Sequence, residues 1–478
     1  MELRHERSQT KVIATIGPVC RNKETLRKMF IEGIDVCRMN FSHDSHDEHL
    51  KTINYIKELN AELNCNVAIL ADLQGPKLRI GKVENDEIFL EEGSKIDFVT
   101  SDCMGTAEKL YMSYELFPQD VEIGDSILID DGKIKLEAIA TNKKDTVTAK
   151  VIYGGTLSSK KGVNLPNTKI SQPSLTKKDI ADAKFALSHD VDWVALSFVR
   201  TAQDVQDLKD LINAEGKQAG VIAKIEKPEA LDDIKAIIKK SDGIMIARGD
   251  LGVEVPFDKV PLIQKKIVRK CVKRGKPVII ATQMMESMIT NFRPTRAEAN
   301  DVGNAVLDGA DAVMLSGETS VGKFPVDAIK SMQQIIDATE FQGFEYKHIN
   351  VPSEKNDTFL PDSVCFTATQ LSDNTDAAAI IVFTHSGYTA YQVSCHRPKA
   401  KIYAFTANKD IIRRLSLVWG VRAFYYDMEM NIVESIQYSI DFLKDQNLLK
   451  EGEVVIHIGS SPIREKGPTN TLKMSYVK

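Results

Sequence analysis

The sequence lacks any stretch apolar enough to cross a membrane, and it lacks the cysteine patterns of a disulfide framework or a zinc site. Charged residues interrupt every apolar run before the roughly 18 residues that a membrane helix needs. The seven cysteines are scattered, odd in number and without a CxxC pair, which favours reduced thiols. The first seven residues are too charged for a signal peptide, so we expect a cytoplasmic protein.

The sequence also lacks an excess of either charge. Its 62 basic residues nearly balance its 67 acidic residues, and no run of like charge would follow a nucleic acid or an anionic membrane. It has no internal repeat and no low-complexity segment. We therefore expect small molecules and copies of the same chain as partners, with no nucleic acid and no membrane.

What the sequence does contain is a recurring pattern of strand followed by helix in a chain long enough for several domains. With 478 residues, of which 43% are hydrophobic, the chain can form two to four domains. Short β-branched apolar runs are each followed by a segment with helical periodicity. Eight such units favour an α/β TIM (β/α)8 barrel over the alternative, an open doubly wound sheet. The eight runs are residues 11–17, 35–42, 67–73, 192–198, 220–226, 243–249, 277–283 and 312–318.

Two segments do not fit this pattern and predict further domains. Residues 74–191 are far longer than one crossover helix and contain short apolar runs separated by turns, which predicts an inserted small β-barrel lid. After about residue 341 a new αβ alternation begins, with strands near residues 379–384, 401–406, 423–426 and 454–458. We expect the barrel in residues 1–74 and 173–342, the lid in 75–172 and a C-terminal α/β domain in 343–478.

Polar side chains gather where the predicted barrel strands end, which is where the active site of a TIM barrel lies. Burying so many polar groups at one rim costs stability unless ligands or one another satisfy them, so the pattern indicates a functional site. The strand ends supply Arg38, Asn40, Ser42, Asp72, Ser197, Lys224, Glu226, Arg248, Asp250, Thr282, Ser316 and Glu318.

Lys224 and Glu226 stand two residues apart on one predicted strand, so their side chains share a face and point into one site. A buried ion pair is the alternative interpretation. Asp250 ends the next strand and favours a ligand site, because two carboxylates and a nearby oxygen-rich ligand suit Mg²⁺ or Mn²⁺. Gly249 would let the backbone approach the ligand closely, although a plain turn glycine is equally allowed.

Five sequence blocks resemble the motifs of the pyruvate kinase family, in the same order and over nearly the whole chain. Residues 221–231, around Lys224, are similar to the active-site signature of that family. The resemblance implies phosphoryl transfer from phosphoenolpyruvate to ADP and a homotetramer whose subunits have a barrel, a lid and a C-terminal domain. The other four blocks are residues 38–43, 159–166, 281–288 and 293–298.

The resemblance also implies a role for each rim residue. Glu226 and Asp250 would hold Mg²⁺ or Mn²⁺, the backbone at Gly249 together with Thr282 would seat the substrate carboxylate, and Lys224 would lie over the transferring phosphoryl group. Cations and positioning suit this chemistry better than a covalent nucleophile. The remaining assignments are phosphate contacts by Arg38 and Arg79, a water relay to the enolate through Thr282 and Ser316, and nucleotide contacts by Asn40, His43, Arg79 and Lys161.

One position departs from part of the family. Pyruvate kinases that need potassium carry a glutamate where this chain has Lys77, and an ammonium group there could replace the bound monovalent cation. We therefore expect activity without potassium; the alternative is an exposed lysine beside an intact cation site. The residues of this site, or of its lysine substitute, would be Asn40, Ser42, Asp72, Leu73 and Lys77.

The C-terminal domain contains a segment similar to the phosphate-cradling effector loop of the family. Its hydroxyl groups and backbone N–H groups at a helix N-terminus suit the phosphate of a sugar phosphate or a nucleotide. The alternative is an ordinary strand-to-helix turn, because the loop has no lysine or arginine. The loop residues are Thr384, His385, Ser386, Gly387, Tyr388 and Thr389.

Two sequence patterns and two alternative functions compete with this interpretation. Residues 317–324 match a Walker A loop except for the final residue, Phe324, which has no hydroxyl for Mg²⁺. The histidines near residue 46 resemble a metal cluster, but Ser45 and Glu48 predict a helix-capping box instead. A Schiff-base aldolase would have no use for the two rim carboxylates, and a non-catalytic scaffold would have lost a site residue, whereas all are present.

Overall fold

A closed barrel of eight parallel strands forms the centre of the computed structural model, which describes residues 8–166, 168–343, 351–427, 431–462 and 467–478. The barrel order is β1-β16-β15-β14-β13-β12-β3-β2, and the eight predicted strands and the TIM-barrel fold are confirmed. Strand bounds are β1 Lys11–Ile16, β2 Val36–Asn40, β3 Ala68–Asp72, β12 Trp193–Leu196, β13 Gly220–Ile225, β14 Gly243–Ala247, β15 Val278–Ala281 and β16 Ala312–Leu315.

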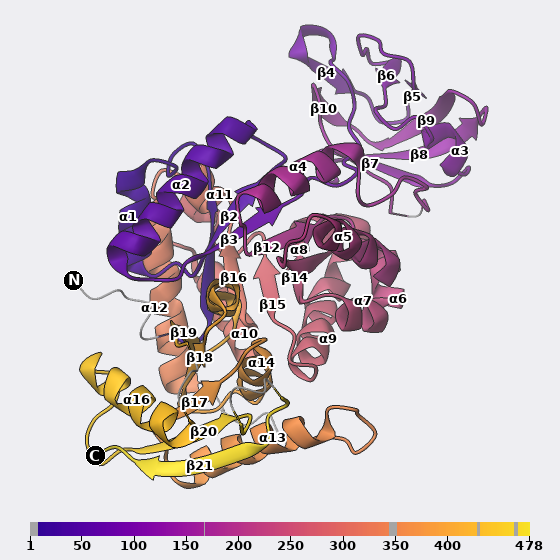
Figure 1. Ribbon diagram of the computed structural model, residues 1–478. Helices are drawn as coiled ribbons and strands as arrows, with labels where there is room; N and C mark the ends of the chain where they lie inside the picture. Colours follow the sequence, from indigo (N-terminus) through magenta and orange to yellow (C-terminus); the bar gives the residue numbers. More distant parts are fainter. Residues whose placement is uncertain (1–7, 167, 344–350, 428–430, 463–466) are drawn as a thin grey trace.

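Helices surround the barrel, as Figure 1 shows. Several begin with a capping box, in which a serine or threonine and an acidic residue three positions later satisfy each other's backbone N–H groups. Ser45 and Glu48 form the predicted box at α2, and others lie at α4, α5 and α10. The helices are α1 Lys23–Glu32, α2 His46–Leu63, α4 Lys177–Ser188, α5 Ala202–Ala214, α6 Pro228–Asp232, α7 Ile234–Lys240, α8 Arg248–Glu254, α9 Val260–Val272, α10 Arg296–Leu307, α11 Gly317–Ser320 and α12 Pro325–Gly343.

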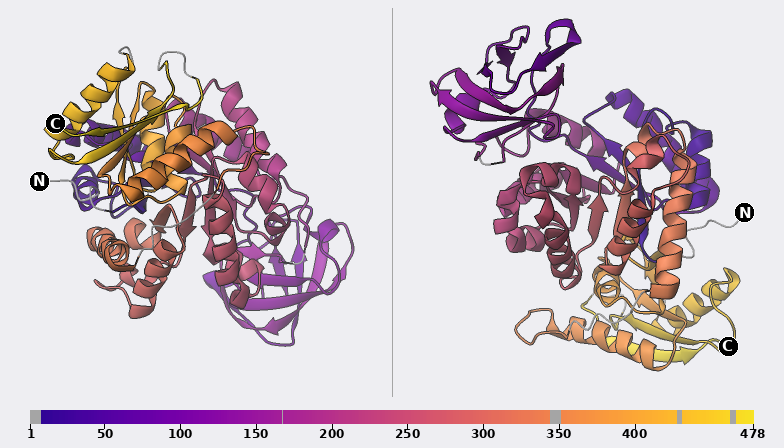
Figure 2. Two further views of the ribbon diagram at one scale, coloured as in Figure 1. Left: turned by 90° about the horizontal axis from the view of Figure 1, so that it is seen from below. Right: turned by 180° about the vertical axis from the view of Figure 1, so that it is seen from behind.

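The inserted segment forms a separate β domain with its own buried core, as predicted. A six-stranded sheet in the order β11-β7-β8-β9-β5-β6 lies beside a two-stranded sheet of β10 and β4. This lid projects from the barrel at the end of β3, and Figures 1 and 2 show it standing beside the barrel mouth. Its elements are β4 Glu87–Leu90, β5 Lys95–Val99, β6 Lys109–Tyr111, α3 Phe117–Asp120, β7 Ser126–Ile129, β8 Ile134–Thr141, β9 Thr146–Tyr153, β10 Gly155–Ser158 and β11 Val163–Asn164.

The C-terminal domain is a five-stranded sheet in the order β19-β18-β17-β20-β21 with helices on both faces. Helices α13, α14 and α15 cover one face and α16 covers the other. Four strands were predicted, and the fifth, antiparallel β21, was missed. The elements are α13 Phe359–Asn374, β17 Ala379–Phe383, α14 Tyr388–Cys395, β18 Lys401–Thr406, α15 Lys409–Arg414, β19 Val421–Tyr425, α16 Ile432–Asp445, β20 Val454–Gly459 and β21 Thr471–Tyr476.

The C-terminal domain closes the end of the barrel opposite the lid. Leu417 is fully buried in the apolar cluster that fills the barrel interior, where it packs with residues of the barrel strands such as Trp193. The ion pairs Arg413–Asp192, at 2.7 Å, and Arg397–Asp311, at 3.0 Å, flank this contact. The barrel core is therefore completed by a residue from another domain. No helix among the described residues is long and apolar enough to span a membrane.

Candidate active site at the barrel mouth

A buried network of charges joins the ends of β13, β3 and β2, of which β13 is separated from β3 by β12. Lys224, on β13, places its Nζ atom 3.0 Å from Glu226 Oε1 and 3.2 Å from Asp72 Oδ1. Arg38, on β2, donates from Nε to Asp72 Oδ2 at 2.6 Å and from its guanidinium to the Thr15 hydroxyl at 2.9 Å. The strand ends predicted to converge therefore do so.

The Lys224 ammonium is held in its charged form. Burial alone would lower the pKa of Lys224, but the carboxylates of Asp72 and Glu226 outweigh it and raise that pKa above its ordinary value. Lys224 also donates to the Ser197 hydroxyl at 2.6 Å. A Schiff-base nucleophile must attack as the neutral amine, and a raised pKa disfavours that form, which argues against the aldolase alternative.

Glu226 and Asp250 are the two carboxylates at the predicted metal position. Burial and the negative charge of Asp250 raise the pKa of Glu226, against the opposing charge of Lys224. The backbone N–H of Phe198 donates to Glu226 Oε2 at 2.7 Å, from a residue whose φ of +54° is unusual for a side chain of its size. Among the described residues no group of three or more histidine, cysteine, aspartate or glutamate side chains could hold a metal by itself, so substrate oxygens would have to complete the coordination.

Thr282 and Gly249 meet across the ends of β15 and β14. The Gly249 N–H donates to Thr282 Oγ1 at 2.7 Å, and a Cβ atom at Gly249 would lie 3.3 Å from that oxygen. Close approach between the two elements therefore favours glycine here. Thr282 has a φ of +68°, a conformation that β-branched residues rarely adopt. Such strain is typical of functional sites.

Ser316 follows β16 and its Oγ atom is buried without a hydrogen-bond partner in the described structure. Its backbone N–H donates to Glu318 Oε2 at 2.7 Å, while the Met285 N–H donates to Glu318 Oε1 at 3.1 Å. The buried Glu318 carboxylate thus joins the ends of β15 and β16. An unpartnered buried hydroxyl is costly, and a water or ligand at the mouth would satisfy it.

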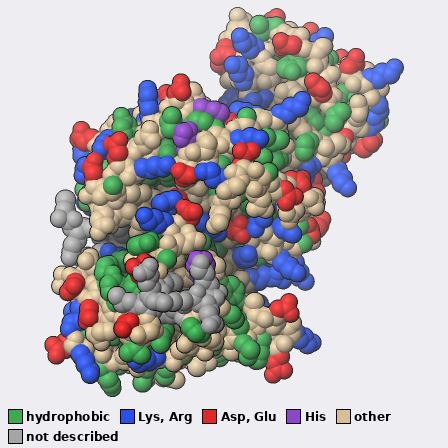
Figure 3. All heavy atoms as spheres, viewed as in Figure 1, with side chains coloured by type: hydrophobic (Ala, Val, Ile, Leu, Met, Phe, Trp, Pro, Cys, Tyr) green, Lys and Arg blue, Asp and Glu red, His purple; other side chains and the backbone are tan. Residues whose placement is uncertain are grey.

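The residues predicted to contact a nucleotide lie on two sides of the space between barrel and lid. Asn40 is the last residue of β2 and His43 lies in the turn that follows, where the His43 N–H donates to the Asn40 carbonyl at 3.2 Å. Arg79 and Lys161 lie at the base of the lid, where Arg79 donates to the Lys160 carbonyl and Lys161 pairs with Asp130 at 2.8 Å. In Figure 3 acidic and basic side chains alternate over the visible face, without a continuous basic band.

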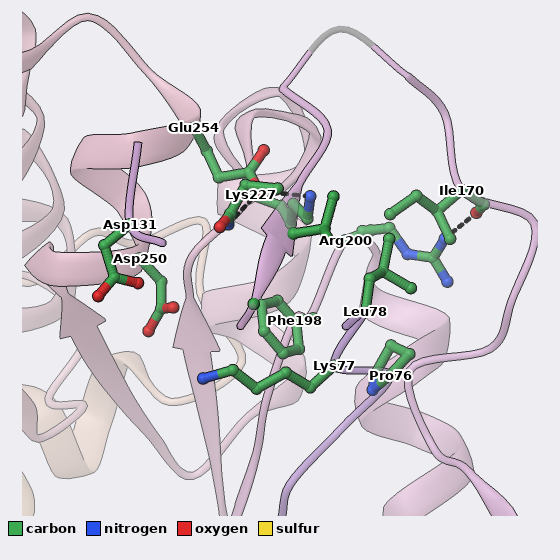
Figure 4. A pocket seen from close by; sticks show the side chains of 13 residues that line it. Pro76, Lys77, Leu78, Asp131, Ile170, Phe198, Arg200, Lys227, Asp250 and Glu254 are labelled. Carbon is green, nitrogen blue, oxygen red and sulfur yellow. Dashed lines mark hydrogen bonds and ion pairs between the residues drawn. The ribbon is translucent and has the colours of Figure 1, made fainter. Parts of the chain in front are cut away.

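Lys77 lines a pocket between the lid and the barrel mouth, together with Phe198, Asp131 and Asp250. Figure 4 shows its side chain extended past Phe198, with the amino group directed toward the side that carries Asp250 and Asp131. The carboxylate of Asp72 is instead occupied by Arg38 and Lys224. Asn40 accepts a hydrogen bond from the Ser42 N–H at 3.1 Å, and Leu73 is buried beside them.

Sequence reasoning missed three residues that join the lid to the barrel. Lys227 and Glu254 form a buried ion pair at 2.7 Å, and Asn164 of the lid donates to the same Glu254 oxygen at 2.8 Å. Lys227 lies one residue beyond Glu226, and this position could have been a signal. Asn164 lies within the motif block of residues 159–166, which did not indicate a contact with the barrel, and Glu254 carried no signal because it follows no predicted barrel strand.

The predicted effector loop connects β17 to α14. Thr384 accepts a hydrogen bond from the Gly387 N–H at 3.0 Å, and the hydroxyls of Thr389 and Thr469 lie 2.6 Å apart. Gly387 has a φ of +84°, which explains its glycine. The other loop residues are His385 and Ser386, both exposed, and Tyr388, whose hydroxyl donates to Asp362.

The barrel, the lid and the charged rim together define a lidded TIM-barrel enzyme, and comparisons with known proteins agree with this fold. The family model "Pyruvate kinase, barrel domain" matches residues 7–329 and "Pyruvate kinase, alpha/beta domain" matches residues 362–475. The chain is 42% identical over 472 residues to a pyruvate kinase of Geobacillus stearothermophilus, covering 98% of this chain and 80% of that protein. Pyruvate kinase 2 of Synechocystis is also 42% identical, covering 98% and 79%.

A solved structure leads to the same family. A pyruvate kinase from Cryptosporidium parvum superposes with a TM-score of 0.93 at 35% identity, covering 100% of this chain and 98% of that one. The chain belongs to the pyruvate kinase family. Its activity is that of a glycolytic phosphotransferase, the transfer of a phosphoryl group from phosphoenolpyruvate to ADP to give pyruvate and ATP.

Proposed function

We propose that the rim residues perform this transfer with Lys224 as the central group. The observation that carries the proposal is the buried Lys224 ammonium, held between Glu226 and Asp72 at the barrel mouth. Its fixed positive charge suits the phosphoryl oxygens during transfer, because phosphoryl transfer depends on positioning and charge neutralisation. Arg38, held by Asp72 and Thr15, supplies a second cation with parallel N–H donors for phosphate.

Glu226 and Asp250 would hold Mg²⁺ or Mn²⁺, together with oxygens of the substrate. Two carboxylates at one site, one of them with a pKa raised by burial and by its negative neighbour, fit a site that gains from a bound cation. When bound, the ion supplies the positive charge that offsets the phosphate and enolate oxygens. The backbone at Gly249 and the Thr282 hydroxyl seat the substrate carboxylate beside it.

The enolate left after transfer must gain a proton at carbon. Thr282 and Ser316 carry the two hydroxyls nearest to the ends of β15 and β16, and the Ser316 hydroxyl has no partner in the described structure. We assign the relay of this proton to a water held by these two hydroxyls. The nucleotide lies between Asn40 and His43 of the barrel and Arg79 and Lys161 of the lid, so closure of the lid excludes water from the transfer.

Three further assignments belong to the same proposal. Lys77 replaces the monovalent cation, the loop from Thr384 to Thr389 binds a sugar phosphate or a nucleotide that regulates the enzyme, and the chain acts in the cytoplasm, where its seven free cysteines stay reduced. A homotetramer belongs to the same proposal and is inferred from membership of the pyruvate kinase family.

The experiment that tests the proposal measures pyruvate formation from phosphoenolpyruvate and ADP with lactate dehydrogenase as the coupling enzyme. Lys224→Met keeps the length of the side chain and removes its charge, so we expect turnover to fall at least about 10³-fold while the fold persists. Chelation of divalent metal should abolish wild-type activity. Lys235→Met, at an exposed lysine on α7, serves as the control. Normal turnover by Lys224→Met, or turnover without metal, would refute these roles.

A further inference from the structure

Arg248 is one of the polar residues at the strand ends to which no role has been assigned so far, and it follows β14 directly before Gly249. Its guanidinium crosses to the turn after β15, where it donates to the Thr282 carbonyl at 2.9 Å and to the Gln283 carbonyl at 3.3 Å. It also contacts Met284 Sδ at 2.9 Å. One side chain therefore holds three successive residues of the neighbouring strand end.

Asp301, on α10, holds the other side of the guanidinium. The two Arg248 terminal nitrogens lie 2.7 Å from Asp301 Oδ1 and Oδ2, in the paired arrangement that a guanidinium and a carboxylate favour. The Arg248 side chain is 12% exposed and that of Asp301 34% exposed. The Gln264 amide oxygen, at 3.5 Å, completes the surroundings. The direction of the Arg248 side chain is thus fixed from both ends.

The turn that Arg248 holds is strained. Thr282 and Gln283 have φ values of +68° and +54°, and two consecutive non-glycine residues in the left-handed region would relax without restraint. In this conformation the Thr282 hydroxyl accepts the Gly249 N–H and donates to the Ala281 carbonyl at 2.6 Å. Relaxation of the turn would move that hydroxyl away from the site.

We propose that Arg248 is a positioning residue for the reaction: together with Asp301 it keeps the Thr282 turn left-handed, so that the Thr282 hydroxyl stays at the substrate. This inference rests on the proposed role of Thr282. Arginine is required because its planar fork places both terminal nitrogens at the Asp301 carboxylate and one of them at the two carbonyls, whereas a lysine carries all its donors on one nitrogen.

The test is a double-mutant cycle of Arg248→Lys and Thr282→Ala, read as kcat and as KM for phosphoenolpyruvate. Arg248→Lys should lower kcat about 10- to 100-fold, since small displacements of a reacting group have effects of this size. In the Thr282→Ala background the same change should cost less than about threefold, because no hydroxyl remains to be positioned. Exchange of the pyruvate methyl hydrogens with D₂O should fall in parallel, because it depends on the same hydroxyl.

The outcomes separate the two claims. If Thr282→Ala retains full activity and exchange, the role of Thr282 is wrong, and Arg248 has nothing to position. If Thr282→Ala is impaired but the two effects multiply, Arg248 acts independently and this inference is overturned. Asp301→Asn, at a partly exposed site, repeats the cycle if Arg248→Lys does not fold, with an expected loss of about 3- to 10-fold in kcat. Arg269→Lys, at an exposed arginine on α9, should leave both readouts unchanged.

Discussion

At the scale of single residues, two buried basic side chains differ in protonation because their surroundings differ. The buried Lys224 is kept charged by two carboxylates, whereas the buried His457 of β20 is kept neutral because burial and the positive charge of Lys473 disfavour its protonated form. Both ring nitrogens of His457 lack a hydrogen-bond partner in the described structure, and burial lowers its pKa from 6.5 to about 4. Burial therefore does not decide protonation without the neighbouring charges.

His457 should make the protein less stable in mild acid. Its pKa is depressed on folding, so the unfolded chain binds more protons between pH 6.5 and pH 4, and the free energy of unfolding falls as pH decreases through this window. From pH 7 to pH 5 this group accounts for about 2 kcal/mol, which His457→Phe should remove. Urea unfolding at the two pH values measures it.

Because of Asp192, the wild type must be compared with His457→Phe. Burial raises the pKa of Asp192 to about 6, so its own contribution has the opposite sign and partly masks that of His457 in the wild type. Asp192 contributes equally to the wild type and to His457→Phe, so its contribution cancels when their free energies of unfolding are subtracted. His385→Asn, at an exposed histidine, should keep the wild-type pH dependence. An equal loss in the wild type and His457→Phe would show that His457 is protonated without penalty.

Lys77 supports a prediction about potassium. Its ammonium reaches the pocket that Asp250 lines, so we expect turnover in tetramethylammonium buffer to change less than about twofold when potassium is added. Lys77→Glu should instead acquire activation by potassium, because the fixed positive charge is replaced by a carboxylate. Lys95→Glu, at an exposed lysine of the lid, is the matched control. Strong potassium activation of the wild type would contradict the assignment.

At the scale of elements, strand ends and the turns that follow them place the chemistry. The capping boxes at Ser45, Thr176, Thr201 and Thr295 start helices at fixed points and so fix the length of each turn before them. The turns themselves depend on contacts between elements, such as the bond from the Gly249 N–H to Thr282. The caps therefore fix where each helix begins, and contacts between neighbouring strand ends fix the geometry of the site.

The turn between β17 and α14 is the element at which we propose that a regulatory ligand binds. A sugar phosphate or a nucleoside monophosphate bound there should shift the half-saturating concentration of phosphoenolpyruvate about 5-fold or more, the usual size of such coupling. Ser386→Asp adds a negative charge at the loop and should abolish the shift while leaving unregulated turnover intact, because charge repulsion disfavours phosphate. Ser353→Asp, at an exposed serine, is the control. If neither ligand shifts the saturation curve, the loop is structural.

At the scale of the whole molecule, three cores are joined by a few buried contacts. The contacts of the lid with the barrel include that of Asn164 with Glu254, the partner of Lys227. The C-terminal domain contacts the barrel through Leu417 and the ion pairs beside it. The first junction lies beside the active-site pocket and the second at the far end of the barrel. The second junction therefore connects the C-terminal domain directly to the strands whose opposite ends carry the proposed catalytic rim.

Leu417→Ala tests the second junction. The side chain is fully buried in the barrel interior, so its removal should leave a cavity and lower the free energy of unfolding of the barrel by about 2–5 kcal/mol. Tryptophan fluorescence during urea unfolding reports on this region, because Trp193 packs in the same cluster and Trp419 lies two residues away. Leu360→Ala, at an exposed leucine, should change little. Equal stability of the two variants would mean that the barrel core is complete without the other domain.

The sequence by itself determined the eight barrel strands, the lid, the C-terminal sheet apart from β21, and the convergence of Lys224, Glu226, Asp72 and Arg38. These follow from hydrophobic periodicity and from the rule that parallel strands end at one edge, both of which are local or topological. Strand β21 was missed because its apolar residues are few and half exposed.

Only the tertiary structure decided how these groups are held. The strained turn at Thr282, the left-handed Phe198 that donates to Glu226, the Arg248 contacts and the insertion of Leu417 into the barrel all join residues distant in sequence. None has a local signature, because each depends on which side chains meet after packing. The charged state of Lys224 was decided in the same way, since it follows from the balance of burial and neighbouring carboxylates.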